Sequence, residues 1–132
     1  MSMVAEIKSR LYYEEFLLQC IRQAFQLRQA GRSEEYLHCV DGIITYLIPK
    51  IKKNVRDLRN ELIKEIDEKL RSLEESLRGE DPLRRALLLK RERKALMIKV
   101  ADLLMERIIE ELDKNGMLMK MRFIEVGRYE GD

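Results

Sequence analysis

The sequence predicts an all-α protein, an antiparallel bundle of three long helices, of which the second is kinked or broken at Pro49 to give four. Through residues 4–114 apolar side chains recur every three or four positions, which is the spacing of one helix face. Gly and Pro stand mainly where these periodic segments end. The chain has 132 residues, 45 % of them hydrophobic, and is long enough for one domain with a real core. We therefore assign residues 1–116 to a single helical domain and residues 117–132 to a C-terminal extended segment or tail.

The first predicted helix covers about residues 4–30, and the second covers about 33–48. Gly31 supplies a stop between them, and Ser33 followed by two glutamates is typical of an N-cap and a first helical turn. A connection this short makes the two helices antiparallel neighbours. The second segment is almost entirely apolar, which is typical of a central helix covered on several sides. Residues 43–48 would also suit a buried strand, but the length and the flanking periodicity favour a helix.

Pro49 separates the second helix from a third, which is predicted over about residues 50–78. Proline lacks a backbone N–H donor and strains the preceding helical turn, yet the apolar pattern resumes at once. Because Ile48 cannot act as a side-chain cap, we favour a kink in one long helix over a complete break. The break is the alternative.

A fourth helix is predicted over about residues 82–114, because Asp81 followed by proline is the usual start signal of a helix. Gly79 ends the third helix, so the last two helices form a long hairpin, residues 50–115. Residues 117–126 alternate loosely between apolar and polar side chains, which predicts a short strand or an extended segment. A lone strand is not stable, so this one would need a partner strand.

The hairpin turn fixes which residues of the two helices lie side by side. Two residues lie at the same height, meaning the same position along the hairpin axis, when their numbers add up to about 160. If the second and third helices form one bent rod, residues 61–97 project beyond the first helix as a two-helix arm. An isolated arm buries one narrow seam, so we expect it to pack on a second copy of the chain as a four-helix assembly. The side chains expected to make this dimer contact are leucines near the tip, namely Leu73, Leu77, Leu83, Leu87, Leu88 and Leu89. If Pro49 breaks the helix completely, a compact monomeric four-helix bundle is expected instead.

The distribution of charge supports a second interpretation, an accessory nucleic-acid-binding protein. The 26 basic and 24 acidic residues leave a net charge of +2, so any attraction to phosphates must come from local patches. One patch comprises Lys50, Lys52, Lys53, Arg56 and Arg59, and the other comprises Arg84, Arg85, Lys90, Arg91, Arg93 and Lys94. At equal heights across the hairpin, the first patch faces Asp102, Glu106 and Glu110, and the second faces Asp67, Glu68, Glu74 and Glu75. We therefore expect ion pairs between the two helices to neutralise most of this charge.

A third and weakest interpretation is a metal-dependent helical hydrolase. Two acidic pairs resemble the paired motifs of all-helical nucleotide pyrophosphohydrolases, which bind magnesium: Glu65 with Glu68, and Glu110 with Asp113. That chemistry requires the two pairs to face each other around the ions, whereas their heights place them more than about 20 Å apart. We predict no metal site, no cofactor and no catalytic residue.

The two cysteines, Cys20 and Cys39, are too few for a disulfide framework or a Cys-based zinc site. We expect them as core thiols on adjacent helices, at heights too different for a disulfide. No apolar run approaches the roughly 18 residues of a membrane span, and the N-terminus lacks a signal-peptide pattern, so a cytoplasmic location is expected. Abundant Glu, Arg and Lys beside scarce Asn and Gln are typical of thermophile proteins.

These patterns favour a non-catalytic helical interaction or scaffold protein that self-associates through its long hairpin. The hairpin arm or the C-terminal segment would hold a further protein partner, and no membrane contact is expected. The hypothesis rests on the long hairpin, the leucine-rich tip and the lack of a recognisable catalytic set.

Overall fold

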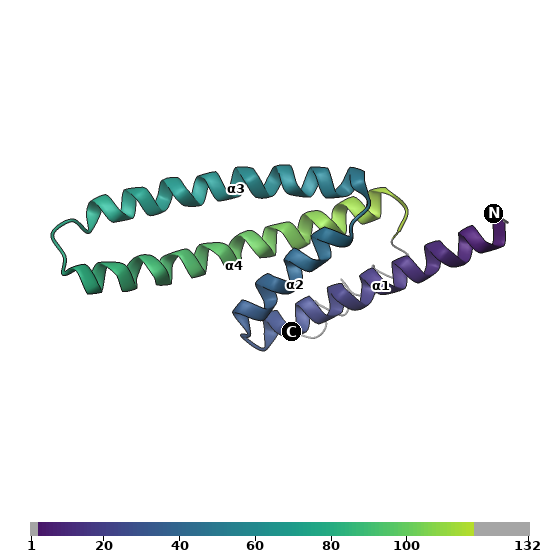
Figure 1. Ribbon diagram of the computed structural model, residues 1–132, viewed down its shortest axis with the longest axis horizontal. Helices are drawn as coiled ribbons and strands as arrows, with labels where there is room; N and C mark the ends of the chain where they lie inside the picture. Colours follow the sequence, from purple (N-terminus) through teal and green to yellow (C-terminus); the bar gives the residue numbers. More distant parts are fainter. Residues whose placement is uncertain (1–2, 118–132) are drawn as a thin grey trace.

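The computed structural model describes residues 3–117 of the chain. They form four helices in the order α1 (Met3–Gln29), α2 (Ser33–Tyr46), α3 (Pro49–Ser76) and α4 (Pro82–Lys114) (Figure 1). The described range contains no strand, so the predicted all-α class is confirmed, and each helix begins and ends close to its predicted bounds. The strand or extended segment predicted at residues 117–126 lies outside the described residues, apart from Met117. None of the described helices is long and apolar enough to cross a membrane.

The turn between α1 and α2 depends on Gly31, whose φ of +72° lies in the left-handed region that favours glycine. Arg32 N donates to the Leu27 carbonyl oxygen at 3.0 Å, a bond that commonly closes a helix after a left-handed residue. This turn places Arg32 at the N-cap position of α2, where no side chain caps the helix, so the predicted N-cap at Ser33 is wrong. Ser33 is instead the first helical residue, and Tyr36 N donates to the Arg32 carbonyl oxygen at 2.9 Å.

The helix is interrupted before Pro49, so α2 and α3 are separate helices. The predicted kink within one long helix is therefore wrong. Leu47 and Ile48 both adopt extended backbone, with ψ angles of 151° and 150°. A residue before proline is pushed out of the helical region, and proline itself suits the first position of a new helix. α3 therefore begins at Pro49 although no side chain caps it. α2 turns back and packs against both α3 and α4 instead of extending α3.

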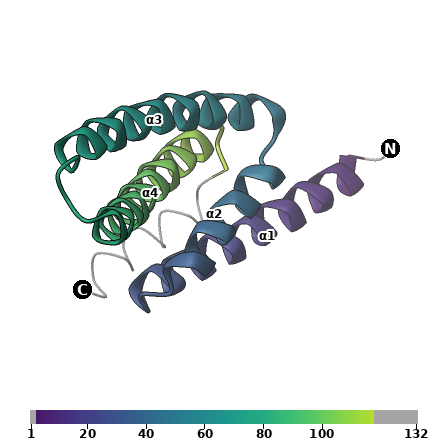
Figure 2. The ribbon, with the colours of Figure 1, turned by 60° about the vertical axis from the view of Figure 1, so that its left-hand side comes forward.

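α3 and α4 form the predicted long hairpin and lie antiparallel along most of their length (Figures 1 and 2). The Asp81 carboxylate accepts a hydrogen bond from Arg84 N at 3.2 Å, which confirms the predicted N-cap of α4. α3 ends at Ser76, slightly before its predicted end, and Gly79 lies in the connection without a positive φ.

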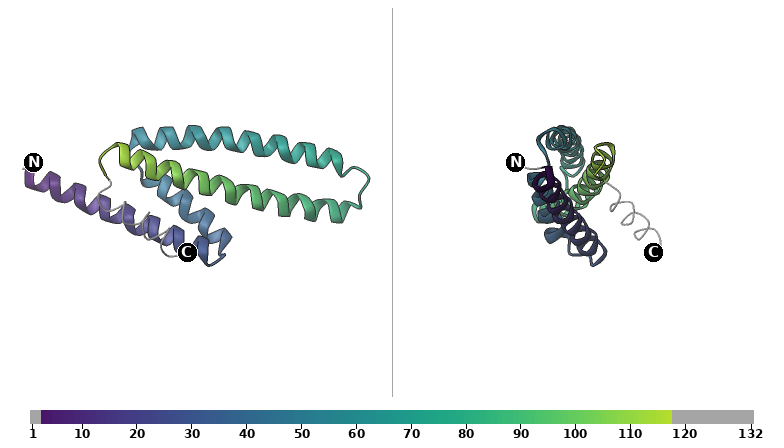
Figure 3. Two further views of the ribbon diagram at one scale, coloured as in Figure 1. Left: turned by 180° about the vertical axis from the view of Figure 1, so that it is seen from behind. Right: turned by 90° about the vertical axis from the view of Figure 1, so that its right-hand side faces the viewer.

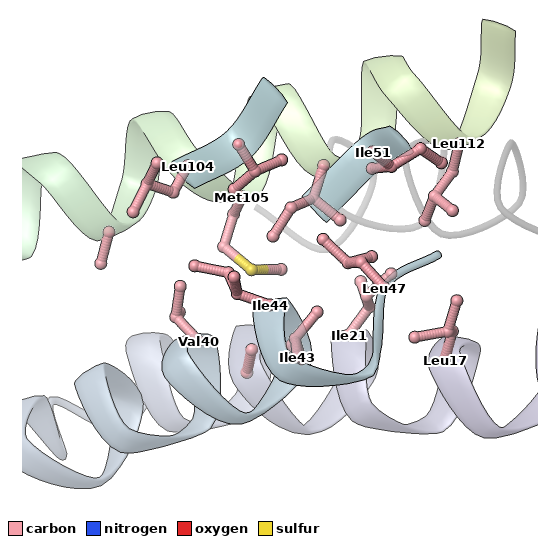
Figure 4. Close-up of a cluster of buried hydrophobic side chains, with 14 of the residues drawn as sticks. Leu17, Ile21, Val40, Ile43, Ile44, Leu47, Ile51, Leu104, Met105 and Leu112 are labelled. Atoms are coloured by element: carbon pink, nitrogen blue, oxygen red, sulfur yellow. The ribbon is translucent and has the colours of Figure 1, made fainter. Parts of the chain in front are cut away.

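The buried core lies at one end of this hairpin, which we call the base. There α2 contacts α1, α3 and α4, as its apolar sequence predicts for a central helix. Figure 4 shows the core side chains converging from the four helices. Its buried members include Leu17 and Ile21 of α1, Ile43 and Ile44 of α2, Ile51 of α3, and Ile108 and Leu112 of α4.

The other end of the hairpin projects beyond α1 and α2 (Figures 1 and 3), and we call its residues 67–95 the arm. No residue between Asp67 and Ala95 is buried, whereas the flanking Ile66 and Leu96 are. The predicted arm is thus present although α2 and α3 are separate helices, and the compact bundle expected from a break is wrong. The physical reason is length: α2 has 14 residues and α3 has 28, so α2 covers only the base once it turns back.

Candidate interaction site on the hairpin arm

Two leucines of the arm are exposed on α4. Leu83 and Leu87 keep 69 % and 59 % of their surface accessible to water. They lie four residues apart and therefore on one face of the helix. At spacings of three and four residues this face continues, past two exposed charged side chains, to Ala101 and Met105, which α1 and α2 cover at the base. We call Leu83 and Leu87 the ridge, because they are the uncovered continuation of a covered face.

The other four leucines proposed for self-association are half-buried, as expected for a seam between only two helices: Leu73, Leu77, Leu88 and Leu89. The structure therefore divides the predicted set. Four leucines are half-buried, and the two of the ridge are exposed. Of the six, the two ridge leucines are the most exposed, and Leu89 lines an open groove described below.

A groove runs between α3 and α4, and at the base α2 lies in it. There Arg59 of α3 pairs with Asp41 of α2, with 3.1 Å between Nη2 and Oδ1. Beyond the Ser33 end of α2, the groove continues along the arm as an open hollow of about 510 Å³, which we call the arm groove. Its lining combines two half-buried leucines with charged side chains: Leu70 and Leu89, with Asp67, Arg71, Glu74, Lys90 and Arg93.

The ion pairs expected across the hairpin are a wrong prediction, because no salt bridge joins α3 to α4 within residues 3–117. The side chains pair elsewhere: Asp102 with Arg28, Arg59 with Asp41, and Arg84 with Glu80. Leucines fill the seam of the arm, so the charged groups lie on its outer faces. In the described part of the chain, the candidate basic residues without a salt bridge are Lys50, Lys52, Lys53, Arg56, Arg85, Lys90, Arg91, Arg93 and Lys94. Lys52 and Arg85 are half-buried, and the others are exposed.

Asp102 is the centre of a polar contact that joins three helices, and we call Arg28, Tyr36 and Asp102 the clasp. Arg28 Nε and Nη2 donate to the Asp102 carboxylate at 3.1 and 3.2 Å, and the Tyr36 hydroxyl donates to its Oδ1 at 2.6 Å. The hydrogen bond to Asp102 and the charge of that carboxylate raise the pKa of the Arg28 guanidinium. The clasp holds α1 and α2 onto α4. In the sequence, the signal for this contact was Arg28, a charged residue among the apolar heptad positions of the first helix.

A second exposed apolar surface, which sequence reasoning missed, lies where α1 meets the end of α2. Tyr12, Phe16 and Tyr46 are exposed, with Tyr12 keeping 74 % of its surface accessible. The Phe16 and Tyr46 rings pack edge to face, with centroids 5.0 Å apart, and the Tyr13 hydroxyl donates to the Tyr46 carbonyl oxygen. The available signal was the four-residue spacing of Tyr12 and Phe16, which places both on one helix face.

In the described part of the chain, no group of three or more His, Cys, Asp or Glu side chains could hold a metal ion. Cys20 and Cys39 are free thiols, and Cys39 Sγ donates to the Cys20 carbonyl oxygen at 3.7 Å. Both pack against the core but are half-buried, so the expectation of core thiols is met only in part. Burial raises the pKa of both thiols.

The arm therefore offers groups suited to association: exposed leucines, a groove with an apolar lining, and charged side chains around it. Protein interfaces combine an apolar centre with a polar rim in the same way. Comparison of the chain with protein-family models, with curated proteins and with solved structures gives no match.

Proposed function

We propose that this chain is a non-catalytic helical interaction protein that self-associates through its hairpin arm. The observation that carries the proposal is the exposure of Leu83 and Leu87 on a face of α4 that other helices cover at the base. An amphipathic helix normally buries its apolar face, and within the described residues 3–117 no third helix packs on the arm to do so. A second arm would supply the missing cover and complete a four-helix assembly.

The magnitude of leucine burial limits how this association works. Covering the exposed part of each ridge leucine contributes about 1–2 kcal/mol, and two copies contribute four such side chains. That sum of about 4–8 kcal/mol is close to the cost of bringing two molecules together, which starts at about 4 kcal/mol. The ridge leucines therefore need further apolar contacts on the surface that receives them. Leu70 and Leu89 in the arm groove are the nearby candidates.

Light scattering coupled to size-exclusion chromatography tests the proposal at micromolar protein concentration. We expect the parent chain to be a dimer and the Leu83→Glu/Leu87→Glu variant to be a monomer with unchanged helical content. Leu103→Glu is the matched control, because Leu103 is also an exposed leucine of α4 but lies outside the arm. A monomeric parent, or a variant that stays dimeric, would overturn the proposal.

A second candidate function is accessory nucleic-acid binding, and the missing cross-hairpin ion pairs favour it. At the start of α3, Lys50, Lys52, Lys53 and Arg56 fall within two turns and form no salt bridge in the described part of the chain. Clustered basic side chains bind phosphates by releasing counterions, so this binding must weaken steeply with salt.

Fluorescence anisotropy with a labelled DNA or RNA oligonucleotide tests this second function. We expect binding at low salt that Lys53→Glu/Arg56→Glu abolishes, while the control Lys64→Glu, an exposed lysine further along α3, retains most of it. Binding that ignores salt, or that both variants reduce equally, would count against a specific basic surface.

A further inference from the structure

We infer that two copies pair arm to arm in antiparallel orientation, so that the ridge of each copy occupies the arm groove of the other. The occupant of the groove is therefore a second copy of this chain. The inference rests on the proposed function, namely self-association through the arm, and adds to it which surfaces meet and in which register.

The base of the molecule already contains a helix packed in this groove. There α2 fills the groove between α3 and α4, with Leu37 and Val40 lining the same small hollow as Met97 and Ala101. α2 does not reach the arm, so the part of the groove that it leaves uncovered is open to a further apolar helix face. The ridge of a second copy is such a face, because it presents two leucines four residues apart.

The heights of ridge and groove determine the orientation. Across the hairpin, Leu70 stands level with about residue 90 of α4, so the groove is centred near residue 90 and the ridge near residue 85. This offset of five residues corresponds to about 8 Å along the helix. A two-fold axis at the height of residues 87–88 places each ridge over the other copy's groove. Leu83 then lies opposite Leu70 of the second copy, to within one helical turn.

The paired arms bring one set of opposite charges together. The ridge is followed on α4 by Lys90 and Arg91, and the lining of the groove carries Asp67 and Glu74 among three basic side chains. None of these four side chains forms a salt bridge in the described part of the chain. In the paired arms, Glu74 lies at the height of Lys90 and Arg91 of the second copy. This contact between opposite charges favours the antiparallel orientation.

Disulfide trapping in a mixture of two variants tests the register. In a background with Cys20→Ser and Cys39→Ser, one preparation carries Leu83→Cys and the other carries Leu70→Cys. Between copies, two Leu83 positions are separated by about 13 Å along the axis and two Leu70 positions by about 8 Å, whereas Leu83 and Leu70 are almost level. A disulfide tolerates a Cα separation of at most about 7 Å. We therefore expect a cross-linked dimer on a non-reducing gel only when the two preparations are mixed.

The outcomes separate the inference from the proposed function. If light scattering finds a dimer but the mixture does not cross-link, or if Leu83→Cys cross-links alone, this register is wrong and self-association stands. If the cysteine-free parent is a monomer, the proposed function fails and the inference with it. A mixture of Leu103→Cys with Leu70→Cys is the control for random collision and should not cross-link, since Leu103 lies outside the arm. Circular dichroism of each variant shows that its fold is kept.

Discussion

The clasp yields a stability prediction whose magnitude follows from its geometry. Asp102→Ala removes the hydrogen bonds from Arg28 and from the Tyr36 hydroxyl, which join α1 and α2 to α4. The Tyr36 bond is partly buried and has a charged acceptor, so it contributes about 1.5 kcal/mol. The Arg28 pair is half-exposed and screened by water, so it adds only about 0.5 kcal/mol. We expect Asp102→Ala to lower the free energy of unfolding by about 2 kcal/mol.

Urea denaturation followed by circular dichroism measures this loss. The protein concentration is held fixed, because the stability of a self-associating chain depends on it. With a slope of about 1.5 kcal/mol per molar urea, the midpoint should fall by roughly 1 M. Glu106→Ala is the matched control, because Glu106 lines the same hollow beside the clasp without a salt bridge in the described chain, and should change stability by less than about 0.5 kcal/mol. A loss no larger than that of the control, or a neutral Tyr36→Phe, would refute the reasoning.

Three further predictions concern the core, the turns and the cysteines. Ile108→Ala, at a fully buried position, should lower the free energy of unfolding by about 2–5 kcal/mol in the same experiment, and a loss below 1 kcal/mol would contradict the assigned core. Gly31→Ala should cost about 1 kcal/mol because its φ is positive, whereas Gly79→Ala, with ordinary φ and open space around it, should cost less than about 0.5 kcal/mol; equal losses would argue against the turn geometry. Burial raises the pKa of Cys20 and Cys39 above the ordinary value of a thiol, so the folded state holds these thiol protons more tightly than the unfolded state. The contribution of these thiols to stability should therefore be fully present below the pKa of an unfolded thiol and be lost as pH rises through the raised pKa of the folded state, and Cys20→Ser/Cys39→Ser should remove that part of the alkaline decline in unfolding curves measured against pH.

The helices and most of their ends could be predicted because the signals are local. Gly31 supplies the positive φ at which the first helix ends, and Asp81 caps the helix that begins at Pro82. The apolar period likewise identifies the faces that must be covered, such as the one that includes Ala101 and Met105. None of these signals depends on which other helix does the covering.

The candidate site could be predicted only in outline. The leucines of the arm were identified from their position near the tip, but the pattern does not separate the four in the seam from the exposed Leu83 and Leu87. The heights across the hairpin suggest that opposite charges are level, and acidic and basic side chains of the two helices do line one hollow of the arm, yet Asp102 bonds to Arg28 and Tyr36 instead. The height of a residue depends on the hairpin alone. The side chain with which a charged residue pairs depends on every helix packed nearby.

The break at Pro49 shows the same division between local and tertiary causes. Proline removes one hydrogen bond and disfavours helical backbone at Ile48, and a kink or a break would each satisfy that constraint. The break prevails in a fold where α2 is apolar on several sides and contacts α1, α3 and α4 at once, contacts that it could not all make as an extension of α3.

By itself, the sequence determined four helical segments, their capping and turn residues, and a long hairpin with more leucine than two helices can bury. The tertiary structure alone decided that α2 turns back into the groove at the base and leaves the groove of the arm open. It also decided that, in the described chain, no basic residue of the hairpin pairs across it: Arg59 pairs with α2, and Arg84 and Arg107 pair with acidic residues three or four positions away. The physical reason is that backbone preferences act between neighbouring residues, whereas the burial of apolar faces is shared among all the helices that compete for the same surface.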